Sequence, residues 1–191
     1  MKQVLKIFFL GIFVFSGMQM MAQTEITPER KQAIDSLAME KVKDLSKYIS
    51  IIGNKETSFS EANRVIDRTL ELFAPNSQIG VSSLYRKDIK YYTVRKYLNR
   101  LMALNYDQVS IKWYNIQYIS DLEPQPDGTY VGVITIYQRF EGRKGDDLAY
   151  VDTTKKDITV YVKRKETQIG GRTIGFWDVL LGDIRVAETS K

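Results

Sequence analysis

The sequence contains no cysteine and no histidine. Without cysteine, the chain forms no disulfide bond and has no thiolate to serve as a nucleophile or a metal ligand. Without histidine, it lacks the commonest general base and the imidazole ligand of many zinc and iron sites. Ser-His-Asp and Cys-His catalysis are therefore excluded, and we predict that the protein holds no metal and no cofactor.

Dense acidic clusters and a strong net charge are also missing. Calcium and magnesium prefer oxygen ligands, but the acidic turns Asp127-Gly128 and Asp146-Asp147 lack the spacing of a calcium-binding loop. Gly170-Gly171 lies between two expected strands and lacks the following helix of a phosphate-binding loop. The formal net charge is only +5, which does not indicate a nucleic-acid partner.

Long apolar runs are absent apart from one near the start. Two lysines precede an apolar stretch at residues 7–15, and Ala22 offers a small residue suited to cleavage. The stretch is short for an uncleaved membrane anchor, and no basic stop-transfer segment follows it. We predict a signal peptide over residues 1–22 and a periplasmic or secreted product, residues 23–191, that forms one domain and meets the membrane only before cleavage.

Three amphipathic helices are expected in the first half of the mature chain. Thr27 is a typical N-cap followed by proline, and apolar residues recur at helical spacing from there to Ile52. The next helix begins with a capping box formed by Ser58 and Glu61. The third covers residues 94–104, with one apolar face and one charged face.

The stretch 108–140 predicts two long strands joined at residues 122–128, which contain two prolines and an Asp-Gly pair. Apolar residues alternate along the first strand, but the phase slips near Tyr114-Asn115, as at a β-bulge. A similar slip at Gly182-Asp183 predicts a second bulge.

The remaining segments read as short strands, turns and two long strands. Residues 85–92 mix charged and aromatic side chains without a period, so we expect them to be irregular. Residues 141–149 are polar and glycine-containing, which indicates a solvated loop. Further strands are expected at residues 78–84, 150–165 and 173–186.

This order of elements resembles the NTF2-like (cystatin-like cone) superfamily. The resemblance covers about residues 28–187, and its most similar segments are Leu70–Val81, Tyr97–Leu101 and Phe176–Val179. It implies an α+β fold in which three N-terminal helices pack on a strongly bent, mostly antiparallel sheet. It also implies a cavity between sheet and helices, or dimerisation through the open sheet face. The family spans isomerases, dehydratases, transport factors and non-catalytic modules, so the fold alone does not give a function.

Enzymes of that superfamily place an acid or a histidine inside the cone, and the candidates here are Asp152 and Asp178. Asp178 has the opposite parity to Trp177, so it faces away from the core if the tryptophan faces inward. An ordinary ion pair is the favoured interpretation for such a carboxylate. Tyr91 and Tyr92 are candidates to donate hydrogen bonds to a ligand, although packing at a loop is the commoner role.

Aromatic residues on the expected strands are candidates for a ligand pocket or a partner surface, and core filling is the alternative. Basic residues at 163–165, together with Arg95, Lys96 and Arg100, would suit an anionic glycan or a membrane surface, although charge runs more often form solvated faces. The ligand- or partner-binding candidates are Trp113, Tyr137, Phe140, Tyr161 and Trp177.

The sequence has no histidine, and its pattern places no acid inside the cone. Both absences favour an exported, non-catalytic binding or assembly module of the cell envelope. Its partner would be an envelope protein, a small apolar ligand or a second copy bound through the sheet face. The alternative is a small periplasmic enzyme of isomerase or dehydratase type with a carboxylate base in the cone. A secreted carbohydrate-binding protein would need exposed coplanar aromatic side chains. A polar cavity containing a carboxylate of raised pKa would favour the enzyme.

Overall fold

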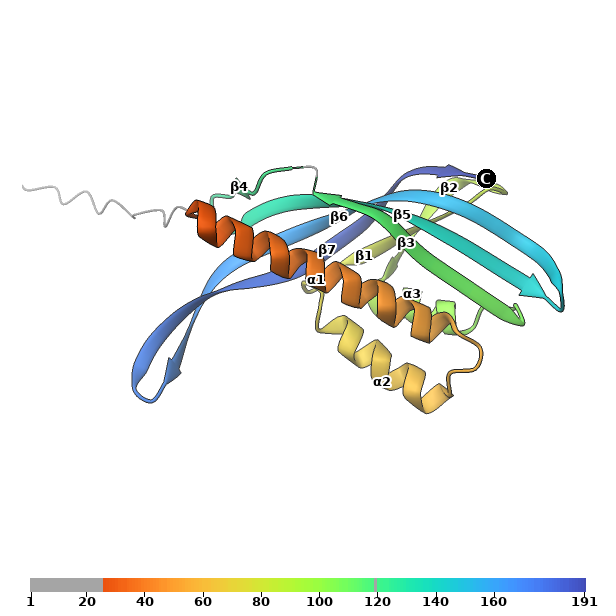
Figure 1. The fold of residues 1–191 in the computed structure, drawn as a ribbon, viewed down its shortest axis with the longest axis horizontal. Helices are drawn as coiled ribbons and strands as arrows, with labels where there is room; N and C mark the ends of the chain where they lie inside the picture. The colour runs from red at the N-terminus through yellow and green to blue at the C-terminus, as the bar shows by residue number, and fades with distance from the viewer. Residues whose placement is uncertain (1–25, 119) are drawn as a thin grey trace, which may run out of the picture.

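A computed structural model describes residues 26–118 and 120–191. The predicted signal peptide, residues 1–22, lies outside the described residues. Within the described part, helices pack against one face of a sheet, which makes the domain α+β (Figure 1). No helix of these residues is both long and apolar enough to cross a membrane.

The helices begin where the capping residues predict. In α1 (Pro28–Gly53), the Thr27 hydroxyl accepts a hydrogen bond from the backbone N–H of Arg30. In α2 (Phe59–Leu70), Ser58 Oγ accepts one from the N–H of Glu61 at 3.2 Å. The third helix, α3, spans Val94–Met102 and buries its apolar face as expected.

The sheet has seven strands in the order β2-β1-β7-β6-β5-β3, with β4 paired to β5 off this path. The pairing of β1 with β7 is parallel and the other pairings are antiparallel. The strands are β1 (Gln78–Ser83), β2 (Arg86–Thr93), β3 (Gln108–Tyr118), β4 (Glu123–Pro124), β5 (Tyr130–Lys144), β6 (Asp147–Ile169) and β7 (Arg172–Ser190).

The cone expected from the resemblance is only partly present. Two helices are followed by the β1–β2 hairpin, a third helix and then long strands, so only two helices precede the sheet and one strand more than expected precedes α3. The long strands curve along their length, yet the sheet stays open, with β2 and β3 at its edges (Figure 1).

Both predicted bulges are confirmed. The β3–β5 register shifts between Tyr114 and Gln117, where Asn115 adopts a positive φ of 48°. The β6–β7 register shifts between Ile158 and Val160, opposite Gly182-Asp183. Each bulge inserts an extra residue that increases the local twist and bends the strand.

Two segments expected to be irregular are strands. Residues 86–93 form β2, and seven of its eight residues are exposed, so no buried face leaves a period in the sequence. Residues 141–149 are mostly strand as well, because β5 continues to Lys144 and β6 begins at Asp147 around a tight turn at Gly145, whose φ is 55°. In both cases exposed polar residues pair through their backbones, which composition does not reveal.

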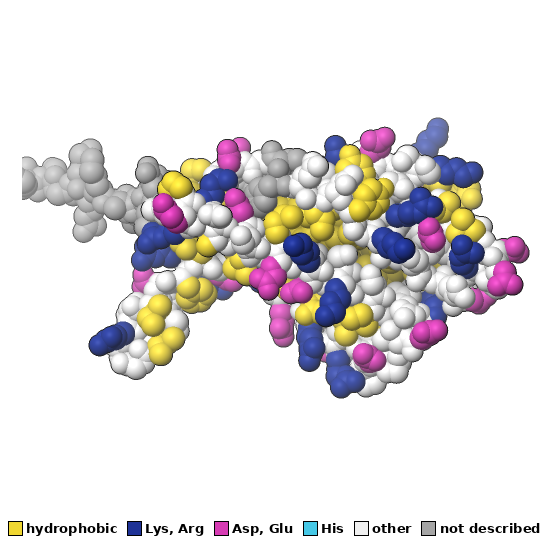
Figure 2. All heavy atoms as spheres, in the orientation of Figure 1, with side chains coloured by type: hydrophobic (Ala, Val, Ile, Leu, Met, Phe, Trp, Pro, Cys, Tyr) yellow, Lys and Arg dark blue, Asp and Glu magenta, His cyan; other side chains and the backbone are white. Residues whose placement is uncertain are grey.

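The far ends of β6 and β7 project beyond the helices as a two-stranded arm (Figure 1). Apolar side chains on this arm reach the surface (Figure 2), and Ile169, Ile174 and Phe176 are among the exposed ones. The main core lies elsewhere, where the apolar faces of the helices meet the inner faces of β5, β6 and β7. Beyond one end of that core the inner face of the sheet becomes polar.

Candidate functional site

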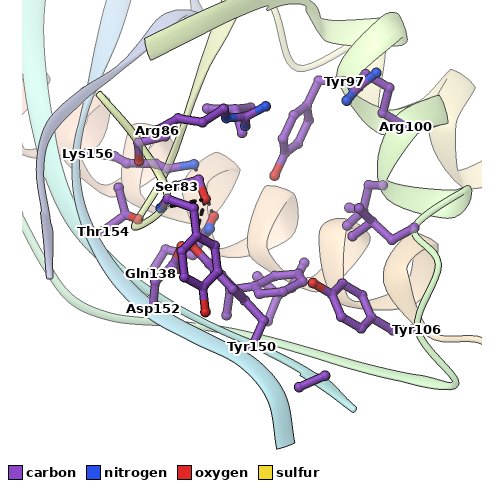
Figure 3. A pocket seen from close by; sticks show the side chains of 18 residues that line it. Ser83, Arg86, Tyr97, Arg100, Tyr106, Gln138, Tyr150, Asp152, Thr154 and Lys156 are labelled. Atoms are coloured by element: carbon purple, nitrogen blue, oxygen red, sulfur yellow. Dashed lines mark hydrogen bonds between the residues drawn. The ribbon is translucent and has the colours of Figure 1, made fainter. Parts of the chain in front are cut away.

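A cavity of about 330 Å³ lies at the polar end of the core. Its walls come from α3, the β1–β2 hairpin and the inner faces of β5 and β6 (Figure 3). This volume is at the lower end of the range for small-molecule sites, roughly 300–1,000 Å³.

Alternation along β6 builds the polar wall of this cavity. Ile158, Val160 and Val162 face the core and are fully buried. The preceding residues of the same parity are Lys156, Thr154 and Asp152, and they are buried too. Because alternate residues of a strand share one face, the inner face of β6 changes from aliphatic to polar and charged at Lys156.

Asp152 supplies a carboxylate inside the cavity, with only 6% of the residue exposed. The phenol of Tyr150 donates a hydrogen bond to its Oδ2 at 2.6 Å, and the backbone N–H of Leu84 in turn donates to that phenol oxygen. Burial raises the pKa of Asp152, although the Tyr150 hydrogen bond and the positive charge of Lys156 oppose the rise. The carboxylate is therefore more basic than an exposed aspartate.

Lys156 places an ammonium group in the same cavity, and only 4% of the residue is exposed. Its Nζ donates to Oε1 of Gln138 at 3.3 Å and lies 5.9 Å from the centre of the Tyr97 ring. Burial lowers the pKa of Lys156 to about 8, because the charged form is poorly solvated, while the charge of Asp152 acts in the opposite direction.

Gln138 and Tyr97 complete the polar interior. The amide oxygen of Gln138 also accepts a hydrogen bond from Trp113 Nε1 at 3.2 Å, which orients the amide group toward Lys156. Burial, with a smaller contribution from the charge of Asp152, raises the pKa of Tyr97 to about 12. Tyr97 therefore stays a neutral hydroxyl that points from α3 into the cavity (Figure 3).

The rest of the wall is aromatic and aliphatic, with two arginines among the lining residues. Phe140 makes edge contacts with both Tyr106 and Tyr150, at ring-centre distances of 5.9 Å and 5.8 Å. Arg86 from β2 and Arg100 from α3 are exposed residues that also line the cavity. The site thus combines an apolar body with a few convergent polar groups, which is typical of ligand pockets.

The structure does not gather the five aromatic candidates in one place. Phe140 lines the cavity. Trp113 does not line it but donates a hydrogen bond to Gln138, which does. Tyr137 stacks on Tyr114 at β3, and Tyr161 lines a broad groove of about 970 Å³ formed in part by outward-facing residues of β5 and β6. Trp177 packs edge-on against Tyr130.

The two candidate carboxylates have different environments. Asp178 forms an ion pair with Lys165 at 2.5 Å and lines that outer groove, as the parity argument predicts. Asp152, in contrast, accepts a hydrogen bond from a phenol inside the cavity and forms no direct ion pair in the described chain. An interior acid therefore exists, contrary to the reasoning that favoured a non-catalytic module.

The basic residues form no single patch. Residues 163–165 lie on β6 toward the arm, whereas Arg95, Lys96 and Arg100 lie on α3, well apart from it (Figure 1). Tyr92 packs under Arg100, 4.7 Å from its guanidinium, and does not line the cavity.

Sequence reasoning missed Lys156, Gln138 and Tyr150 as members of the site. The signal was present in β6, because Tyr150, Asp152, Thr154 and Lys156 have the same parity as the apolar residues that follow. Polar residues on the buried parity of a strand indicate an internal polar site.

No family model and no curated protein matches the chain. Two solved structures are similar to it in fold. One is a scytalone dehydratase-like protein from Novosphingobium aromaticivorans, 12% identical with a TM-score of 0.44, covering 85% of this chain and 90% of that one. The other is a type 2 hexachlorocyclohexane dehydrochlorinase (LinA), 9% identical with a TM-score of 0.40, covering 83% of this chain and 91% of that one. The likeness is one of fold alone and does not indicate what this chain binds or does.

Proposed function

We propose that this chain is a small acid–base enzyme of isomerase or dehydratase type, with Asp152 as the base. The observation that carries the proposal is the Asp152 carboxylate, which lines a cavity, is 6% exposed and has a raised pKa. A titratable group whose pKa is shifted by burial inside a cavity is a candidate catalytic residue. This favours the enzymatic alternative over the non-catalytic module.

The chemistry that fits is removal of a proton from a carbon next to a carbonyl group. The Asp152 carboxylate takes the proton, and the electron pair moves onto the carbonyl oxygen to give an enolate. Where a carbon–carbon double bond adjoins the acidic carbon, the enolate is a dienolate, and return of the proton from Asp152 to its far carbon completes an isomerisation. Where the neighbouring carbon carries a hydroxyl group, the enolate expels that group, which takes the proton from Asp152 and leaves as water, and this completes a dehydration. The Tyr97 hydroxyl, which lines the cavity, is placed to donate a hydrogen bond to the enolate oxygen, whereas the Lys156 ammonium is placed to bind negative charge elsewhere on the substrate.

Deuterium exchange tests the proposal without knowledge of the natural substrate. Small ketones and β-hydroxy ketones are incubated with the protein in D₂O, and loss of the α-proton signal is followed by ¹H NMR. We expect exchange with wild type and a rate about 10²–10⁴-fold lower with Asp152→Asn, because positioned general bases contribute that much.

Asp178→Asn is the matched control, because Asp178 is the other candidate carboxylate from the sequence and is paired with Lys165 outside the cavity. This variant should exchange within about twofold of wild type. Circular dichroism confirms that both variants are folded. Exchange by Asp152→Asn at the wild-type rate would refute the role of Asp152.

A binding role for the outer sheet face is a second candidate, favoured by the Tyr114–Tyr137 stack and the groove beside Tyr161. The partner bound at this face would be an envelope protein or a second copy of the chain. Light scattering of the purified protein, with Tyr137→Glu as the disrupting variant, tests the second copy. Export to the periplasm or medium stays a prediction, and a mature N-terminus at Gln23 would support it.

A further inference from the structure

We infer that the cavity takes a small organic carboxylate, whose carboxylate group binds the ammonium of Lys156 and whose apolar body lies against the aromatic wall. This assigns a ligand class to the site and rests on the proposed function only in that both concern the same cavity.

The first support is an unmet hydrogen-bonding requirement. A lysine ammonium has three N–H donors. In the described chain Lys156 uses one of them, toward Gln138, and no carboxylate lies within ion-pair distance. A buried charge without a close counter-ion is costly, and an anion entering the cavity removes that cost.

The second support is the charge around the cavity. Lys156, Arg86 and Arg100 line it, whereas Asp152 is its one carboxylate among the described residues. The surplus is positive, and the two arginines are exposed, so they attract an anion from solution before it reaches Lys156.

The nature of the wall favours a carboxylate over a phosphate. The Lys156 side is a single ammonium with an amide oxygen beside it, which suits one negative charge. A dianion would be repelled by Asp152, and among the lining residues no helix start or glycine-rich loop offers backbone N–H groups to it. Tyr106, Phe140 and Tyr150 instead offer aromatic surface to an apolar body.

The spacing of the two charged groups also limits the ligand. Asp152 and Lys156 are four residues apart on one face of β6, so their Cα atoms are about 13 Å apart at about 3.3 Å per residue. A carboxylate held at Lys156 therefore leaves the base facing a different part of the molecule.

Benzoate and benzamide are suitable probes, since they share a ring and differ in charge. Isothermal titration calorimetry should show binding of benzoate and at least tenfold weaker binding of benzamide. Lys156→Met should weaken benzoate binding at least tenfold. Lys155→Met, on the opposite face of the same strand, should leave it within about twofold.

The affinity should also depend on pH. Between pH 7 and 9 the Lys156 ammonium, with a pKa of about 8, loses its proton, so benzoate affinity should fall about tenfold. The other charged side chains that line the cavity are Arg86, Arg100 and Asp152. Burial raises the pKa of Tyr97 to about 12 and that of Tyr150 above its usual 10, so both phenols keep their protons in this window. The fall in affinity is therefore assigned to Lys156.

Equal affinity for benzoate and benzamide, or benzoate binding unchanged in a folded Lys156→Met, would overturn the inference. Tighter binding of inorganic phosphate than of benzoate would overturn the ligand class. Asp152→Asn separates the two proposals, because it should slow deuterium exchange about 10²–10⁴-fold and retain benzoate binding. Benzoate binding through Lys156 without exchange by wild type would remove the proposed function and leave this inference standing.

Discussion

Replacing Lys156 with methionine should make the protein more stable at neutral pH. Burial lowers the pKa of this lysine from 10.5 to about 8, so keeping it charged at pH 7 costs about 3 kcal/mol in the folded state. Methionine fills a similar volume without a charge, but it gives up the hydrogen bond to Gln138, worth about 1 kcal/mol. The net expectation is a gain of about 2 kcal/mol in the free energy of unfolding.

The gain should disappear as the pH rises. Between about pH 8 and 10.5 the unfolded chain binds more protons at this lysine than the folded chain does, so wild-type stability rises with pH there. Lys156→Met lacks this contribution. The two proteins should therefore differ by about 2 kcal/mol at pH 7 and by close to zero at pH 9.5.

Urea unfolding at pH 7.0 and 9.5, followed by circular dichroism, measures both differences. Lys155→Met is the control, because Lys155 is only half-buried and has the opposite parity on β6. It should not change the difference between the two pH values. The reasoning would be refuted if Lys156→Met were less stable than wild type at pH 7. It would also be refuted if the two proteins differed in free energy of unfolding by the same amount at both pH values.

Three further changes test the fold. Ser58→Ala removes the side-chain cap of α2 and should cost about 1 kcal/mol in urea unfolding, whereas Ser58→Asp should restore most of it. Gly182→Ala places a Cβ against the Tyr161 ring at the β7 bulge and should cost about 1–3 kcal/mol; an unchanged unfolding midpoint would mean that the ring moves freely. Leu45→Ala in the buried face of α1 should lower stability by about 2–5 kcal/mol, and Leu148→Ala, at an exposed position, should stay within about 0.5 kcal/mol.

The sequence by itself determined the local elements that have one buried face and one exposed face. Helical spacing and capping residues such as Ser58 placed the helices, because a helix with one buried face repeats its apolar residues every three to four positions. Phase slips at Asn115 and Gly182 located both bulges, because an extra residue reverses the alternation. The parity of Asp178 predicted its outward direction.

Only the tertiary structure decided the secondary structure of segments that have no buried face. It also decided which side chains come together at the cavity. Strand β2 forms through backbone hydrogen bonds to β1, and exposed side chains leave no record of such a partner. The site needs Tyr97 from α3, Gln138 from β5 and Lys156 from β6 to converge. Each lies far from the others in sequence, and only sheet register and helix packing bring them together. The low pKa of Lys156 follows from burial at that junction, which no local pattern of residues contains.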